Sequence, residues 1–162
     1  MTSTISAATL SVTVSESILI NGYERGSSNS LTMGSILNVD MRTHTISTTE
    51  EDLLKFGTTA SGGQYAKGSV RYCRITNKDD TNHCILVMKN TGNSSTNEIA
   101  VSLDTGQSFL VPVTNAGGTD ATLQSAQTAL SVAGGMTLDD LISITAVAST
   151  GTVMLEVFIA SV

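Results

Sequence analysis

Alternating apolar and polar residues dominate residues 70–113. Four runs rich in Val, Ile, Leu, Phe and Tyr are separated there by clusters of Asn, Asp, Thr and Gly. In the third and fourth runs every second residue is apolar, namely Ile99, Val101, Leu103, Phe109, Val111 and Val113. A period of two is that of a β-strand with one buried face. We therefore predict two consecutive antiparallel hairpins, the second closed at Asp104-Thr105-Gly106, where the glycine supplies a positive φ.

The first predicted hairpin has apolar residues on both faces. If Asn77–Asn82 forms its loop, Ile75 lies opposite Cys84 and Cys73 lies opposite Leu86. One face then carries Cys73, Ile75, Cys84, Leu86 and Met88, and the other carries Val70, Tyr72, Ile85 and Val87, with Arg74 among them. We expect such strands at the centre of a sheet that is covered on both sides, either by a second sheet and a loop or by a neighbouring subunit.

The N-terminal third shows the same alternation with weaker boundaries. Residues Thr9–Val14 predict a first strand, and Ile18–Ile20 predict its continuation or a second short piece before a turn at Asn21-Gly22. A polar loop over residues 23–29 precedes Leu31 and Met33, which begin a further alternating segment. The pattern then continues to Ile46, with a bulge expected near Asn38, where the phase slips.

Two segments between residues 48 and 68 are less regular. Residues 48–57 fit either the start of a helix or a turn that leads into a short strand ending at Gly57, and the strand is favoured because the apolar run is short. Residues 58–68 (TTASGGQYAKG) predict a loop of small residues, of the kind in which binding contacts often lie on a rigid β-scaffold.

The last third changes character before it ends in strands. Thr114–Gly135 lacks strand alternation, and Ala121–Val132 contains enough Ala, Leu and Gln for about two helical turns, with Gly134-Gly135 as the stop. Leu141–Ala148 and Thr152–Ile159 then predict a final hairpin across residues 149–151. Its buried candidates are Leu141, Ile144, Val147, Val153, Leu155, Val157 and Ile159.

Taken together, these elements predict an all-β fold. We expect a jelly-roll-like β-sandwich of about eight to ten short antiparallel strands with at most one short helix. Residues 1–8 would form a flexible N-terminal arm, and residues 9–162 would form a single sandwich domain. A chain of 162 residues with 40% apolar content is long enough to bury one core.

Charge narrows the classes of partner. The formal net charge is −6, and the acidic residues are dispersed with no Lys/Arg cluster. This distribution disfavours binding to nucleic acid or to an anionic membrane. No apolar run approaches the roughly 20 residues of a spanning helix. The N-terminus has neither a basic start nor an apolar core of a secretion signal, so we expect synthesis and assembly in a cytoplasm.

The two cysteines, Cys73 and Cys84, predict buried thiols. In the register above they are diagonal neighbours about 7–8 Å apart at Cα, beyond the usual reach of a disulfide. A zinc site with His83 is the alternative, but His83 would point to the opposite face from Cys84, which leaves too few ligands. We therefore expect two reduced thiols that pack as small apolar side chains.

Candidate catalytic chemistry is sparse along the sequence. His44 and His83 are the only histidines, and the chain contains no nucleophile elbow, phosphate-binding glycine loop or HExxH pattern. The Asn77–Asn82 loop has oxygen ligands suited to calcium, yet it lacks the spaced acidic ligands and the bidentate Glu of a calcium loop. We therefore predict no catalytic, cofactor-binding or metal-binding residues and no enzymatic activity.

Three segments resemble a group of small β-rich virion structural proteins of tailed bacteriophages, notably phages of marine bacteria. These segments are SESILINGYERGSSNSLT (residues 15–32), VRYCRITNKDDTNHCILVMKN (70–90) and IAVSLDTGQSFLVPV (99–113). The recognisable parts are the I-T-N-x-D-x-T-N loop and the L-D-x-G-x-S-F hairpin. The resemblance covers most of residues 10–113 and implies a non-enzymatic component of an assembled particle.

On this basis we expect a capsid decoration or cement protein that is part of the virion. Its partners would be the major capsid protein and copies of itself in a homotrimer, and its candidate contacts are Met1–Ala8, Thr58–Gly68 and Thr114–Gly135. A tail or neck component of the same virion is an alternative. A carbohydrate-binding β-sandwich is a weaker one, because three Tyr, three Phe and no Trp offer few aromatic platforms. A cupin-like enzyme comes last, since two separated His cannot form its metal site.

Overall fold

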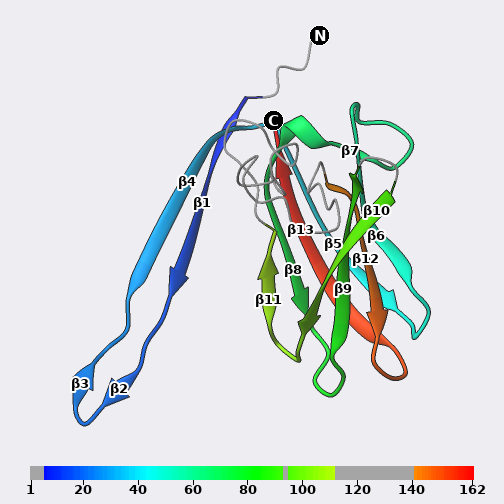
Figure 1. Ribbon diagram of the computed structural model, residues 1–162. Helices are drawn as coiled ribbons and strands as arrows, with labels where there is room; N and C mark the ends of the chain where they lie inside the picture. The colour runs from blue at the N-terminus through cyan, green and yellow to red at the C-terminus, as the bar shows by residue number, and fades with distance from the viewer. Residues whose placement is uncertain (1–5, 93–94, 112–140) are drawn as a thin grey trace, which may run out of the picture.

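Two facing sheets form a β-sandwich in the computed structural model, which describes residues 6–92, 95–111 and 141–162 (Figure 1). The five-stranded sheet has the order β10 (Ser95–Leu103), β9 (Cys84–Gly92), β12 (Leu141–Ala148), β6 (Glu51–Gly57), β7 (Tyr65–Ala66). The four-stranded sheet has the order β11 (Ser108–Leu110), β8 (Val70–Asn77), β13 (Val153–Ser161), β5 (Asn38–Ile46). The predicted all-β sandwich is confirmed.

A long two-stranded ribbon precedes the sandwich in the chain. It pairs β1 (Ala8–Ser15) with β4 (Ser28–Ile36), and its tip pairs β2 (Leu19–Ile20) with β3 (Tyr23–Glu24). The predicted turn at Asn21-Gly22 forms this tip, with positive φ angles of 52° and 82°. Figure 1 shows the ribbon standing away from the two sandwich sheets. The irregularity expected near Asn38 lies where the chain leaves the ribbon and enters β5.

Thirteen strands lie in the described ranges. Three of them, β2, β3 and β7, have two residues each, and the other ten have three or more. The predicted short strand ending at Gly57 is β6. Within residues 58–68 the structure contains β7, which pairs with β6 in parallel, and a 3₁₀ turn at Lys67–Ser69. The helix predicted at Ala121–Val132 lies outside the described residues.

The predicted pairing of the strands in residues 70–113 is wrong, although the strands themselves are present. β8 pairs with β11 and β13, whereas β9 pairs with β10 and β12, so Cys84 lies opposite Leu103 rather than Ile75. The final hairpin prediction fails in the same way, because β12 and β13 belong to different sheets. The three predicted hairpin loops are therefore arches that carry the chain from one sheet to the other.

The arches bend one long hairpin across the sandwich. β9 and β10 pair in the five-stranded sheet, and their continuations β8 and β11 pair in the four-stranded sheet. This bent hairpin is the jelly-roll-like part of the fold. A fourth arch, between β5 and β6, lies at the same end of the molecule (Figure 1).

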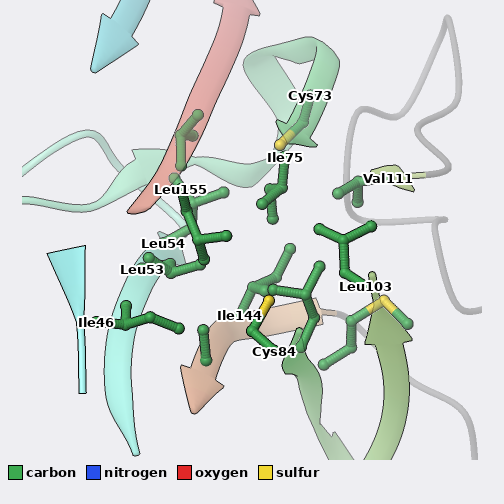
Figure 2. Packing of buried hydrophobic residues seen from close by; sticks show 14 of the residues in the cluster. Ile46, Leu53, Leu54, Cys73, Ile75, Cys84, Leu103, Val111, Ile144 and Leu155 are labelled. Carbon is green, nitrogen blue, oxygen red and sulfur yellow. The ribbon is translucent and has the colours of Figure 1, made fainter. Parts of the chain in front are cut away.

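The core fills the space between the inner faces of the two sheets (Figure 2). Leucine and isoleucine side chains from both sheets are almost fully buried, including Ile46, Leu54, Ile75, Leu86, Ile144 and Leu155. Val70, predicted on the opposite face from Cys73, also lies in this core. The reason is a register shift at the Ala160/Ser161 step of β13, which turns Val70 inward. Val147 is only half-buried, and Ala146 and Ala148 are buried instead.

Both cysteines are free and buried, as expected. Their predicted diagonal position on one sheet is wrong, because Cys73 belongs to the four-stranded sheet and Cys84 to the five-stranded sheet. Loss of solvation raises the pKa of Cys73 to about 12 and that of Cys84 to about 11. Both thiols are therefore protonated and unreactive in the folded chain at neutral pH.

Asn77 joins the arches through a fully buried side chain. Its Nδ2 donates to the carbonyl of Asn82 at 2.9 Å and to that of Leu103 at 3.2 Å, while its Oδ1 accepts from the backbone N–H of Asp79 at 2.9 Å. Its backbone N–H donates to Gln107 O at 2.9 Å. One residue thus ties together the β8–β9 arch and the β10–β11 arch.

The remaining arches are bonded to these two. Ser149 N–H donates to His83 O at 3.0 Å, and Ala148 N–H donates to Ser47 O at 2.8 Å. The hydroxyl of Thr150 donates to the side-chain oxygen of Asn82 at 2.8 Å. The backbone turns that this requires use Gly106 and Gly151, whose φ angles are 71° and 58°. This end of the sandwich is consequently closed by bonds between loops.

Replacing Asn77 should destabilise the whole fold. Asn77→Ala leaves the buried Leu103 carbonyl and the Asp79 amide without their partners, which we expect to cost roughly 2–4 kcal/mol in the free energy of unfolding. Urea denaturation followed by circular dichroism measures this cost. Lys78→Ala, at the exposed neighbouring side chain, is the matched control, and a loss at Asn77 no larger than that at Lys78 would contradict the role of the amide.

Alkaline pH should weaken the fold through the thiols. Because their pKa values are raised above the ordinary value of 9.0, the unfolded chain releases these protons first, so stability is complete below pH 9 and falls as the pH rises toward 12. Urea titrations at several pH values measure this slope. The Cys73→Ala/Cys84→Ala double variant should show a flatter slope, and an unchanged slope would exclude the thiols as its cause.

Candidate interaction surface

The ribbon separates apolar from polar side chains by face. The cross-strand pairs Leu10–Met33 and Val12–Leu31, followed by Val14, alternate with the pairs Ser11–Thr32 and Thr13–Ser30. Because successive residues of a strand point to opposite faces, one face of the ribbon is aliphatic apart from Asn29, which pairs with Val14, and the polar side chains of the other are those of Ser and Thr. We call the first the apolar ribbon face. An apolar face is unusual on a two-stranded ribbon, since such a ribbon has no second layer of structure to cover that face.

The base of the ribbon packs on the sandwich. Met33 and Ile36 are buried together with Ala160 of β13, and Leu10, Val12, Tyr72 and Phe158 pack around them. The backbone N–H of Leu37 donates to Ser161 O at 2.9 Å, which fixes the exit from the ribbon. The proximal part of the apolar ribbon face is therefore held against the outer face of the four-stranded sheet.

The distal part of the ribbon is uncovered. Val14 is 50% exposed and Leu31 60% exposed, although both lie on the apolar ribbon face. At the tip Leu19 and Tyr23 are each 69% exposed, and Ile18 and Ile20 are also exposed. Several exposed apolar side chains on one element are typical of an interaction site.

A second apolar surface lies on the outer face of the four-stranded sheet. Two adjacent rows of outward residues cross the strands: Met41, Phe158, Arg74 and Leu110 in one, and Val39, Ala160 and Tyr72 in the other. We call these two rows the sheet patch. Val39, Met41 and Leu110 are exposed, whereas the ribbon base shelters Ala160. The next row, Thr43, Glu156, Thr76 and Ser108, is polar and bounds the patch.

Aromatic and charged contacts order the middle of the sheet patch. The rings of Tyr72 and Phe158 meet edge to face with centroids 5.8 Å apart, and the guanidinium of Arg74 lies 5.9 Å from the Phe158 ring centroid. Arg74 also forms an ion pair with Glu156. Its Nε is buried and donates to no acceptor. The patch therefore has no unpaired charge but does contain one unsatisfied donor.

The ribbon tip is shaped by a carboxylate and a glycine. Oε1 of Glu24 accepts from the backbone N–H groups of Gly26 at 2.9 Å and Ile18 at 3.1 Å, and these bonds lower the pKa of Glu24. A Cβ atom at Gly26 would lie 2.0 Å from the carbonyl oxygen of Glu16. Only glycine fits there without moving the backbone, so the bend below the tip depends on this residue.

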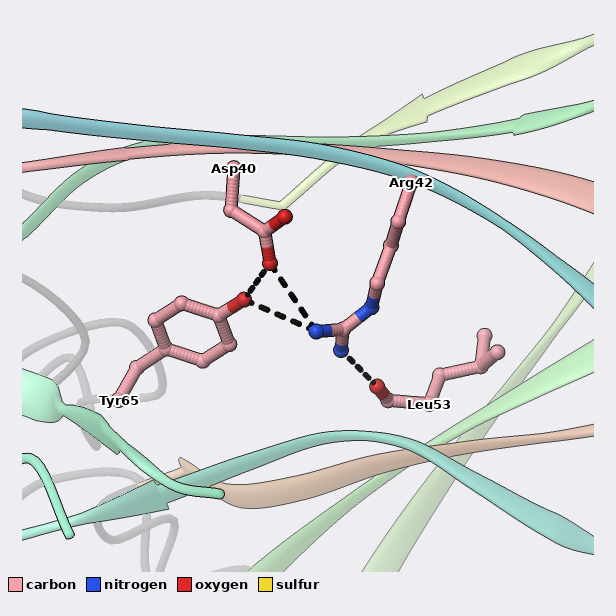
Figure 3. Close-up of polar contacts among 4 residues, drawn as sticks. All are labelled: Asp40, Arg42, Leu53 and Tyr65. Carbon is pink, nitrogen blue, oxygen red and sulfur yellow. Dashed lines mark hydrogen bonds and ion pairs between the residues drawn. The ribbon is translucent and has the colours of Figure 1, made fainter.

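The predicted contact loop Thr58–Gly68 is pinned at its far end to the sandwich edge (Figure 3). Nη1 of Arg42 donates to Asp40 at 3.0 Å and to the Tyr65 hydroxyl at 3.1 Å, while Nη2 donates to Leu53 O at 2.8 Å. The Tyr65 hydroxyl in turn donates to Asp40. Loss of solvation and this bond raise the pKa of Tyr65 to about 12. The cluster holds the two sheets together where β5 forms an edge.

Beside this cluster lies an open cleft lined by Arg42, His44, Asp52, Leu53, Lys55, Gly62 and Gly63. Its charged groups are largely paired, since Lys55 bonds Asp52 at 2.8 Å and Arg42 bonds Asp40, which lies outside the lining. His44 Nε2 is 3.9 Å from a Glu51 carboxylate oxygen. The cleft thus has ion pairs already formed rather than free groups directed at a ligand.

The oxygens of the Asn77–Asn82 loop are used by the loop itself. The Asp79 carboxylate accepts from the backbone N–H groups of Thr81 at 2.9 Å and Asn82 at 2.7 Å, which lowers the pKa of Asp79. Asn77 is the arch-joining residue described above. Within the ranges that the structure describes, no group of three His, Cys, Asp or Glu side chains could hold a metal ion. His83 contributes its backbone carbonyl to an arch bond.

Sequence reasoning missed both apolar surfaces. Of the predicted contacts, Thr114–Gly135 and residues 1–5 of Met1–Ala8 lie outside the described residues, and Ala8 begins β1. The ribbon could have been predicted from the sequence. Two segments in which apolar residues alternate with Ser and Thr lie on either side of the turn residues Asn21-Gly22. The sheet patch could not, because its residues come from four strands that are distant in sequence.

No protein-family model, curated protein or solved structure matches this chain. Within the described part of the chain, no helix has the length and apolar character needed to cross a membrane. The two apolar surfaces and the resemblance described above are the features of this chain that bear on its function.

Replacing Gly26 should disorder the ribbon tip without unfolding the sandwich. Gly26→Ala forces the backbone away from Glu16 and breaks the bonds to Glu24, so amide hydrogen exchange over residues 16–26 should accelerate at least tenfold while the core strands stay protected. Gly34→Ala is the matched control, because nothing lies within 4 Å of a Cβ there. Equal exchange in the two variants would show that the tip does not depend on Gly26.

Proposed function

We propose that this chain is a structural protein of a bacteriophage virion, namely a decoration or cement protein that binds the outer lattice of the head. The observation that carries the proposal is the amphipathic ribbon, whose apolar face extends beyond the sandwich with exposed aliphatic side chains. The resemblance of three segments to small β-rich virion proteins supplies the phage context. Under this proposal the partners are the major capsid protein and copies of the chain itself, arranged as a homotrimer.

The two parts of the molecule suit such a role. The sandwich is closed at one end by bonds between its arches, so it would act as a rigid body placed on the shell. The ribbon would extend to a neighbouring subunit of the assembly, either the major capsid protein or another copy of this chain, and bury its apolar side chains against that subunit. Each contact is small, but many copies on one shell act together and reinforce junctions between capsid subunits.

The mechanism needs surface burial and no chemical step. At about 25 cal/mol per Å² of apolar surface, covering the distal ribbon gives a contact of a few kcal/mol, which a lattice multiplies by copy number. The exposed side chains at the ribbon tip, Ile18, Leu19, Ile20 and Tyr23, are the group we expect to contribute most. The predicted contact segments Met1–Ala8 and Thr114–Gly135 remain additional candidates.

Copy number in purified particles tests the proposal. Quantitative mass spectrometry of gradient-purified virions should give a ratio of this chain to the major capsid protein near that of the shell, and heads lacking the chain should release their DNA at a lower temperature. A ratio of a few per cent would instead indicate a neck or tail component. Absence of the chain from particles would overturn the virion role and favour a soluble binding module.

A further inference from the structure

The apolar ribbon face and the sheet patch match each other within one chain. The proximal half of the ribbon, through Met33 and Leu10, already packs against Ala160, Tyr72 and Phe158 of the patch. This intramolecular contact shows that the two surfaces fit in chemistry. Beyond it both surfaces continue uncovered, as Leu31 on the ribbon and as Met41, 65% exposed, on the patch.

A chain cannot cover both remaining surfaces by itself while its ribbon stands away from the sandwich (Figure 1). The base contact and the Leu37–Ser161 bond hold the ribbon in that position. The distal half of the ribbon is then free to reach another molecule. The exposed part of the sheet patch, at Val39, Met41 and Leu110, is free to receive one.

The absence of unpaired charge is compatible with a second copy as the occupant. The strands β1 and β4 contain no charged residue, and the only charge in the patch, Arg74, is paired with Glu156. Contact between these strands and the patch therefore buries no unpaired charge.

The dimensions of the distal half suit a small contact. From Ile36 to the turn at Asn21-Gly22 the ribbon spans roughly 50 Å at about 3.3 Å per residue, and its proximal half already packs on its own sandwich. The distal half, about 25 Å long and about 10 Å wide, offers roughly 250 Å². Since each copy would donate one distal half and accept another, each would bury roughly 500 Å², which is below the roughly 800 Å² per partner of standard interfaces and typical of a weak, reversible association.

We propose that the distal half of the ribbon docks on the sheet patch of a second copy of this chain. Each copy then donates a ribbon and accepts one. Repeated head to tail, this contact generates a closed ring or an open filament, and mutual exchange between two copies generates a two-fold pair. This inference rests on the proposed structural role, in which copies assemble. The test below uses the purified full chain alone, so its failure can be told apart from absence of the chain from virions.

Sedimentation velocity of the wild type and four variants tests both surfaces. The wild type should associate at micromolar concentration, and Leu31→Asp or Met41→Asp should each weaken association at least a hundredfold. Thr32→Asp, next to Leu31 on the Ser/Thr face, and Thr45→Asp, on β5 outside the patch, introduce the same charge and should associate like the wild type. The four substituted side chains are exposed, so the variants should fold, and circular dichroism verifies the fold.

Mixing the two defective variants separates this contact from other modes of self-association. Leu31→Asp keeps an intact patch and Met41→Asp keeps an intact ribbon, so an equimolar mixture should regain a two-chain complex that neither variant forms alone. Failure of the mixture to associate would indicate ribbon-to-ribbon or patch-to-patch contact and overturn the proposal. A wild type that stays monomeric at 100-fold higher concentration, or a Leu31→Asp variant that still associates alone, would overturn it as well.

Discussion

The buried amide of Asn77 is the interaction on which the arrangement of the two sheets depends. Its two side-chain donors and one acceptor are all used, by Asn82, Leu103 and Asp79. An amide can offer this combination, whereas a carboxylate cannot donate and an aliphatic side chain can do neither. Because the carbonyls it satisfies belong to different arches, the bonds fix where the chain crosses between the sheets. The sandwich is thereby rigid at one end, and the ribbon is the element left free to act.

The strands could be predicted from the sequence because burial imposes a period of two wherever one face meets a core. Ile75, Leu86, Leu103 and Leu155 all lie inside, as their alternation indicated. The pairing could not be predicted, since Ile75 and Cys84 face the same core whether they lie on neighbouring strands of one sheet or on opposing sheets. The neighbours that β8 takes instead include β13, about 80 residues later in the chain. Turn residues such as Asp104-Thr105-Gly106 serve hairpins and arches equally well.

The candidate surfaces show where local patterns stop being informative. Val12 and Val14 have the alternation of strands that pack into their own core, yet Val14 lies half exposed on a ribbon. Sequence alone records that a face is apolar and does not record which molecule covers it. The Asp40–Arg42–Tyr65 cluster was beyond prediction for a different reason, because Tyr65 reaches strand β5 only after the loop of residues 58–64 has folded back.

The composition of the ribbon has a consequence for the conditions under which it can act. Its two long strands contain neither acid nor base, and the polar side chains of their Ser/Thr face are hydroxyl groups. Dissolved ions screen and weaken contacts between charged groups, and these two strands have no charged group to be screened. Burial of aliphatic groups is instead strengthened by strongly hydrated salts. A contact made by these strands should therefore persist at both low and high salt concentration. The stability of an assembly that uses this contact would then not require low ionic strength.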